Sequence, residues 1–225
     1  MTPNDVSILF LTLRVALCAT LVILPLGVGA GWLLARRAGG FRPLVETVLS
    51  LPLVLPPTAV GLLLLQALRP RGMAGRLLDS VGIELLFTWK AAVVATAVMS
   101  FPLLVRPART AFEEIDPRLL AMGRSLGSSP VRVFGRVALP LAWRGILAGT
   151  LLAFCRALGE FGATILVAGN IPGRTQTLSL AIFQRTQVGQ DQAAMRLVAL
   201  TVVIAFVTVL ASELVARRRS QRTAV

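Results

Sequence analysis

The chain has 225 residues, of which 56% are hydrophobic and 15% charged, and its 23 Lys and Arg against 10 Asp and Glu give a net charge of +13. Soluble nucleic-acid-binding proteins are rarely this apolar, so the composition favours a membrane protein and argues against nucleic acid as a partner. The chain contains no His, and its single lysine, Lys90, follows no glycine-rich loop. These absences exclude His-based catalysis, His-ligated metals and a phosphate-binding loop. We expect no catalytic residue, metal site or bound cofactor in this chain, and ATP, if it drives the protein, must be bound with its Mg²⁺ by another chain.

Five apolar stretches are long enough to be transmembrane helices, at about residues 10–35, 45–68, 88–106, 142–169 and 196–216. A hydrocarbon core of about 30 Å needs about 20 helical residues, and these stretches leave no room for a soluble domain of ordinary size. The sequence thus predicts an all-α membrane protein in which residues 1–225 form a single transmembrane domain with five transmembrane helices.

The second stretch contains three prolines, Pro52, Pro56 and Pro57. Proline removes a backbone hydrogen bond from a helix, and in a membrane such a break is tolerated where the segment lines a cavity or packs on other helices. Two interpretations stay open. Either Pro56 and Pro57 mark a wall of a pathway through the membrane, or the segment is a kinked packing helix.

The orientation in the membrane follows from the distribution of basic residues. An odd number of spans places the two termini on opposite sides, and basic residues gather on the cytoplasmic side. With the N-terminus outside, the inner segments carry 14 Lys and Arg and the outer segments carry 7, while Arg14 and Arg156 lie within or beside spans. The first 13 residues carry no Lys or Arg, so we expect the first span to be retained rather than cleaved. We therefore expect an outer N-terminus and a cytoplasmic C-terminus.

The loop between the third and fourth spans, residues 107–140, is polar and basic but patterned as helix. Pro117 follows acidic residues and begins an apolar periodicity that ends at Gly127, a natural helix stop. The sequence Ser128-Ser129-Pro130 then supplies a cap and a first turn for a second short helix, which continues to Pro140. The residues alone leave two interpretations open, an amphipathic hairpin on anionic lipid or a docking site for a partner.

The spacing within this loop is specific. Gly127 is followed after nine residues by Val137-Ala138-Leu139-Pro140, which resembles the signature of ABC importer permeases, E-A-A-x3-G-x9-I-x-L-P. Ala121-Met122-Gly123 stands where E-A-A is expected, so the glutamate of the signature is missing, and Val137 replaces the isoleucine. In that family the loop is a coupling helix that docks in a groove of a cytoplasmic ATPase subunit. The resemblance implies this role for Ala121, Met122, Gly123, Arg124, Leu126, Gly127, Ser128 and Pro140.

The resemblance covers most of the chain and is closest to molybdate ABC transporter permease subunits. The runs that carry it are LPLVLPP at 51–57, MSFPL at 99–103, ALGEFGAT at 157–164 and GNIPGRTQT at 169–177. It implies the type I ABC importer permease fold, alternating access, and a multi-pass place in the cytoplasmic (inner) membrane of a bacterium. It also implies two cytoplasmic ATP-binding subunits and a periplasmic or extracytoplasmic molybdate-binding protein. Five spans enclose little of a path, so a second copy of the chain, a homodimer in contact with membrane lipid, is expected as well.

Other functions stay open at this point. Relatives of the same family carry tungstate or sulfate and thiosulfate, and the sequence does not separate these anions. An ion-coupled secondary transporter would need titratable groups inside the membrane, and Glu160 is the one convincing candidate. A membrane anchor without a transport function would need no broken spans.

A charged pair lies inside the fourth span. Arg156 and Glu160 are four residues apart, a spacing that places both on one face of a helix. A lone charge in the middle of a bilayer costs about 2.5 to 3.5 kcal/mol, so the two side chains should face each other, a cavity or a partner. They form either a structural ion pair or part of a gate on an anion path. The candidate pathway and gate residues are Pro56, Pro57, Arg156, Gly159, Glu160, Phe161 and Gly162, with Gly159 and Gly162 allowing close helix approach.

Overall fold

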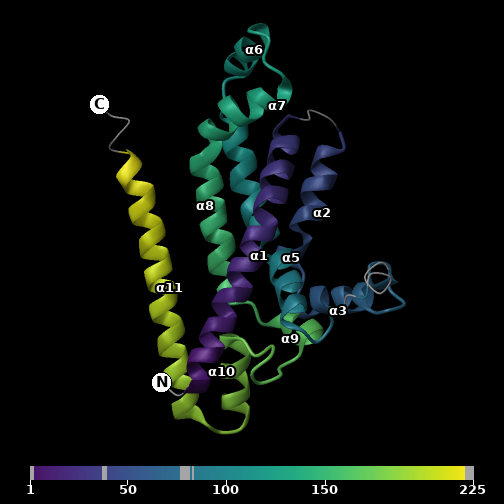
Figure 1. The fold of residues 1–225 in the computed structure, drawn as a ribbon, viewed down its shortest axis with the longest axis vertical. Coiled ribbons are helices and arrows are strands. Elements are labelled where there is room, and N and C mark those ends of the chain that lie inside the picture. The colour runs from purple at the N-terminus through teal and green to yellow at the C-terminus, as the bar shows by residue number, and fades with distance from the viewer. Residues whose placement is uncertain (1–2, 37–39, 77–81, 83, 221–225) are drawn as a thin grey trace.

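The computed structural model describes residues 3–36, 40–76, 82 and 84–220, with residues 211–220 described as helix only. In these ranges every regular element is helical (Figure 1). The elements are α1 (Pro3–Arg36), α2 (Arg42–Val54), α3 (Pro57–Leu68), α5 (Trp89–Glu113), α6 (Pro117–Ser125), α7 (Pro130–Val133), the π-helical turn η1 (Phe134–Ala138), α8 (Leu139–Leu158), α9 (Gly162–Ala168), α10 (Leu178–Gln187) and α11 (Asp191–Ser220).

The core of the bundle is α5, which packs lengthwise between α1 and α8. Small residues bring these helices together: a Cβ on Gly149 of α8 would lie 3.0 Å from the carbonyl oxygen of Leu104, and one on Gly145 would lie 3.0 Å from that of Pro107. Such contacts between small residues and backbone are the usual means by which membrane helices associate. α11 stands beside the bundle and packs on α10 and α8 (Figure 1).

Four helical segments are long and apolar enough to cross a membrane: α1, α5, the continuous run from Pro130 to Leu158, and α11 as far as Leu210. The bent pair of α2 and α3 would be a fifth span. Figure 1 shows α6 and α7 at one end of the bundle and α9 and α10 toward the other, which we call the α6 end and the α10 end. α1 begins at the α10 end and α11 finishes toward the α6 end, so the chain enters and leaves the bundle at opposite ends.

Two predicted spans differ from the helices observed. The stretch 45–68 is not one helix, because the chain breaks at Leu55 and Pro56 and α3 turns away from α2 by 110°. The stretch 142–169 is not one helix either, because α8 ends at Leu158. The physical reason is the same in both places: proline and glycine residues interrupt the ladder of backbone hydrogen bonds, which restarts in a new direction. α10 was not among the expected elements.

Two contacts fasten α10 to the first part of α1. A guanidinium nitrogen of Arg185 donates to Oδ1 of Asp5 at 2.7 Å, and the backbone N–H of Leu178 donates to the hydroxyl oxygen of Thr12 at 2.9 Å. Arg185 also donates to the carbonyl oxygen of Ala193 in the first turn of α11, so it joins three helices. Both Asp5 and Thr12 are buried.

The variant Asp5→Ala tests this fastening. Removing one partner of a buried ion pair costs about 3–5 kcal/mol, and we expect about 2 kcal/mol here because the Arg185 side chain keeps 18% exposure. Thermal unfolding of the purified chain in detergent measures the effect. Asp191→Ala is the matched control, since Asp191 is exposed and forms no ion pair with the described part of the chain. Equal unfolding midpoints for the two variants would contradict the role of Asp5.

Candidate functional site

The α6 end carries a helical hairpin formed by α6 and α7, residues 116–133. Asp116 caps α6, because its Oδ1 accepts the backbone N–H of Arg118 at 2.8 Å. Gly127 then turns the chain with φ of +76°. Ser129 caps α7, with its hydroxyl oxygen accepting the N–H of Arg132. The predicted order of helix, glycine turn and helix is therefore present.

The second helix of the hairpin does not stop at Pro140, as the sequence suggested, but runs through η1 into α8. Pro140 has no backbone N–H, and the wider π-helical turn before it accommodates this missing donor, with the N–H of Leu139 bonded to the carbonyl oxygen of Phe134. α5 likewise extends to Glu113, so most of the predicted loop 107–140 is helix. The hairpin is thus joined rigidly to α8.

A cluster of buried hydrophobic residues packs the hairpin against the bundle. Leu120 of α6 is fully buried and packs in one cluster with Phe112 of α5, with Ile115 just after that helix and with Val133 of α7. Phe112 also belongs to an aromatic trio with Trp32 and Phe134, in which the ring centroids are 5.2 to 6.0 Å apart. A displacement of the hairpin must therefore move the end of α5.

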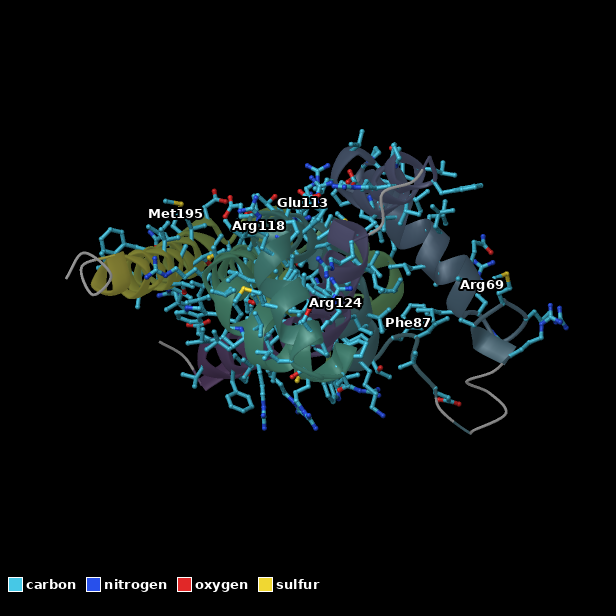
Figure 2. All side chains as sticks on the ribbon, turned by 90° about the horizontal axis from the view of Figure 1, so that it is seen from above. Arg69, Phe87, Glu113, Arg118, Arg124 and Met195 are labelled. Carbon is cyan, nitrogen blue, oxygen red and sulfur yellow. The ribbon has the colours of Figure 1, made fainter. Side chains whose placement is uncertain are left out.

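The opposite face of the hairpin is apolar and exposed. Leu126 and Val131 are 84% and 79% exposed, and Leu119 and Met122 are exposed as well. Three arginines of the same hairpin are exposed as well: Arg118, Arg124 and Arg132. Seen from the α6 end, Arg118 and Arg124 lie over the bundle, whereas Arg69 and Met195 lie toward opposite sides (Figure 2). Exposed apolar side chains with exposed arginines near them, at one end of the bundle, are typical of a protein docking surface.

The predicted coupling residues differ in how exposed they are. Six of them are exposed: Ala121, Met122, Arg124, Leu126, Gly127 and Pro140. Gly123 and Ser128 are half-buried, and a Cβ on Gly123 would lie 3.2 Å from a methyl of Val133, so Gly123 sets the spacing of α6 and α7. Pro140 lies away from the patch, in the first turn of α8.

The variant Gly127→Val tests the hairpin turn. A residue other than glycine in the left-handed region costs about 1–2 kcal/mol, and a β-branched one is worse. We expect the hairpin to shift and, in the role that the sequence resemblance implies for this loop, the ATPase activity of the partner subunit to lose its response to loaded binding protein. Gly135→Val is the control, because Gly135 has a helical backbone and open space around it. A Gly127→Val complex that still responds would contradict the prediction.

A second candidate site lies where α8 ends and α9 begins. The helix ends at Leu158, so Arg156 and Glu160 do not share a helical face, and the expectation of one continuous helix is wrong. The two side chains still meet: a guanidinium nitrogen of Arg156 lies 2.7 Å from Oε2 of Glu160. Oε1 of Glu160 accepts the backbone N–H of Ala163 at 2.9 Å, which caps the start of α9. Glu160 is buried, with 1% of its side chain exposed, against 28% for Arg156.

The broken second span packs against this site. A Cβ on Gly162 would lie 2.7 Å from Cβ of Pro57, and one on Gly61 of α3 would lie 2.8 Å from Cα of Ala163. α3 and α9 are therefore in backbone contact. Gly159 does not take part, since a Cβ there would meet nothing within 4 Å, and the close approach predicted at this glycine is wrong.

The other predicted pathway residues flank this contact. Pro56 precedes α3 at the break from α2. Phe161 turns toward α10 and packs on Phe183, with ring centroids 5.0 Å apart. Pro57, Glu160 and Gly162 thus lie together where α3 meets the start of α9, whereas Phe161 packs on α10.

Sequence reasoning missed a cluster of four charges, Arg42 and Glu46 of α2 with Arg109 and Glu113 of α5, which we call the charge quartet. It lies beside a groove of about 780 Å³ between α2 and α5, whose lining includes Ser50, Pro102 and Arg106. The available signal was the repeated spacing of an arginine and a glutamate four residues apart. Within the described ranges, no three His, Cys, Asp or Glu residues gather to form a metal site.

The bundle, the broken span and the exposed hairpin are the features of a transport subunit. Residues 23–222 match the family described as binding-protein-dependent transport system inner membrane component, and the chain belongs to this family. It is 44% identical to the molybdenum transport system permease protein ModB of Escherichia coli strain K12, over 99% of this chain and 98% of that protein. The molybdenum transport system permease protein ModB of Haemophilus influenzae is 40% identical over 97% of this chain and 96% of its own length.

Solved structures share the fold. A bacterial ABC transporter involved in the import of the acidic polysaccharide alginate superposes with a TM-score of 0.78 at 18% identity, covering 97% of this chain and 81% of that chain. An identity this low shows the fold alone. The chain is accordingly an all-α, multi-pass inner-membrane protein with the type I ABC importer permease fold.

Proposed function

We propose that this chain is the membrane-spanning permease subunit of an ABC importer that carries molybdate into the cell. The observation that supports molybdate as the substrate is the similarity to a molybdenum transport permease, which extends over nearly the full length of both proteins. The bundle and its broken span supply a scaffold for a membrane path. The sequence contains no phosphate-binding loop, so ATP and Mg²⁺ belong to a partner chain.

The α6–α7 hairpin is the docking surface for that partner. Its exposed leucine, methionine and valine side chains offer the apolar anchors of an interface, and its exposed arginines offer charges complementary to acidic groups. Because the hairpin continues into α8 and packs on the end of α5, a movement of the ATPase reaches the bundle without passing through a flexible loop. Two ATP-binding subunits, one under each permease chain, complete the assembly.

A second copy of this chain closes the path. α2 buries none of its residues, and apolar side chains such as Val48 and Val54 are exposed along it. The groove between α2 and α5 is likewise open on one side in a single chain. In a symmetric dimer the same surfaces of two copies face each other, so each copy supplies half of the path.

The α6 end faces the cytoplasm in this account, with the N-terminus outside and the C-terminus inside. This orientation places the arginines of the hairpin on the side where basic residues accumulate. The loaded molybdate-binding protein then docks at the α10 end. ATP binding closes the ATPases, moves the hairpins and turns the path outward, and hydrolysis returns it inward.

The substrate is tested by ATPase stimulation. The complex of two permease chains and two ATPase chains is reconstituted with purified binding proteins that are loaded with molybdate, tungstate or sulfate. We expect the molybdate-loaded protein to raise ATP hydrolysis most. Stronger stimulation by the sulfate-loaded protein would contradict molybdate as the substrate, and no stimulation by any of the three would contradict the importer.

A further inference from the structure

The charge quartet joins two helices that belong to different parts of the bundle. On α2, Arg42 bonds to Glu46 at 2.7 Å, and on α5, Arg109 lies 3.6 Å from Glu113. Across the helices, Arg42 pairs with Glu113, and Arg109 pairs with Glu46 at 2.5 Å. Each arginine therefore meets both glutamates. The side chains keep 25 to 30% exposure, so the pairs form and separate without the large desolvation cost of a buried charge.

The quartet is the main polar attachment of α2 to the bundle. α2 has no buried residue, and its principal neighbour is α5. At its far end the chain breaks at Leu55 and Pro56 and turns by 110° into α3. The quartet thus holds one end of a short helix whose other end leads, through a bend, to the contact between α3 and α9 at Glu160.

The α5 side of the quartet lies next to the hairpin. Phe112 precedes Glu113 directly and Ile115 follows two residues later, and both of these pack in one cluster with Leu120 of α6. Figure 2 labels Glu113 and Arg118, where the end of α5 adjoins the start of α6. A displacement of the hairpin that carries the end of α5 with it therefore moves Arg109 and Glu113 relative to the bundle.

We infer that the charge quartet transmits the movement of the α6–α7 hairpin to α2 and, through the bend, to the contact between α3 and α9. Its four residues are positioning residues: they touch neither ATP nor the transported anion in this account. The inference rests on the proposed function, because it needs an ATPase that docks on the hairpin. The carboxylates matter through charge and geometry together, since each lies within ion-pair distance of two arginines.

The test compares Glu46→Gln with Glu114→Gln in the complete complex with ATPases and binding protein. Both variants remove one carboxylate near the α6 end, but Glu114 is exposed and belongs to no ion pair with the described residues. The measurement is the number of molybdate ions taken up per ATP hydrolysed in proteoliposomes. Glu46→Gln loses the partly exposed charge pairs with Arg42 and Arg109 and is expected to lower this ratio about fivefold, with ATP hydrolysis retained. Glu114→Gln is expected to keep the wild-type ratio.

A second variant keeps the test valid if Glu46→Gln does not assemble. Arg109→Lys preserves the charge but loses the forked guanidinium that reaches Glu46 and Glu113 together, so we expect a smaller fall of the same ratio. An unchanged ratio in these variants, or an equal fall in Glu114→Gln, overturns the inference. A wild-type complex that hydrolyses ATP but imports none of molybdate, tungstate and sulfate contradicts the proposed function as well. Normal wild-type transport with unchanged variants contradicts the inference alone.

Discussion

Replacing Glu160 by glutamine is expected to lower molybdate uptake by about tenfold while the protein stays folded. Glutamine keeps the side-chain oxygen that accepts the N–H of Ala163, so the cap of α9 survives. It removes the negative charge opposite Arg156, whose guanidinium then faces the site without its counter-ion. Under the proposed function this site borders the path of the transported anion, where an uncompensated cation would hold the anion and slow its release. Uptake into proteoliposomes and the unfolding midpoint, measured on the same preparation, separate transport from folding.

The double variant Arg156→Gln with Glu160→Gln identifies the cause. If the unpaired cation is responsible, neutralising it restores part of the uptake that the single variant loses. The variant Glu160→Ala removes the cap as well as the charge, so it should also lower the unfolding midpoint. Uptake by Glu160→Gln equal to that of the wild type would contradict a gating role and leave the pair as a structural one.

The variant Gly61→Ala is expected to have the second large effect, on both stability and transport. Its Cβ would lie 2.8 Å from Cα and 3.0 Å from the carbonyl oxygen of Ala163, and backbone atoms cannot rotate away as a side chain can. α3 and α9 must therefore separate. Overpacking of this kind costs about 1–3 kcal/mol, and here it displaces the segment that Glu160 caps.

Gly29→Ala is the matched control for this prediction. Gly29 also lies inside a helix, but a Cβ there would meet nothing within 4 Å, so alanine should be neutral or stabilising. Unfolding midpoints and molybdate uptake are compared for the two variants. Equal behaviour would show that the contact between α3 and α9 is not required.

Local features of this fold could be predicted because neighbouring residues determine them. Pro117, Gly127 and Ser129 establish the start, turn and cap of the hairpin through their own backbone preferences. The three prolines of the second span predicted a break, and a break is present. Its angle of 110° could not be predicted, because it depends on the packing of α3 against the glycine at the start of α9.

Features that depend on contacts between separate helices were missed or misplaced. The spacing of Arg156 and Glu160 predicted their pairing but not the helix end between them, which lies at Leu158. The charge quartet forms only because α2 and α5 lie side by side, and this arrangement of the two helices could not be predicted from the sequence. α10 is short and carries Arg185, so no long apolar stretch marks it, and its attachment to Asp5 spans 180 residues of sequence.

The most direct test of the whole account is ATP-driven uptake of molybdate by the purified complex in proteoliposomes. The vesicles hold ATP and Mg²⁺ on the side of the ATPases, and the loaded molybdate-binding protein is added on the opposite side. The account predicts uptake that requires both ATP and the binding protein and that does not respond to a proton or sodium gradient. Uptake by this chain on an ion gradient without ATP would contradict it.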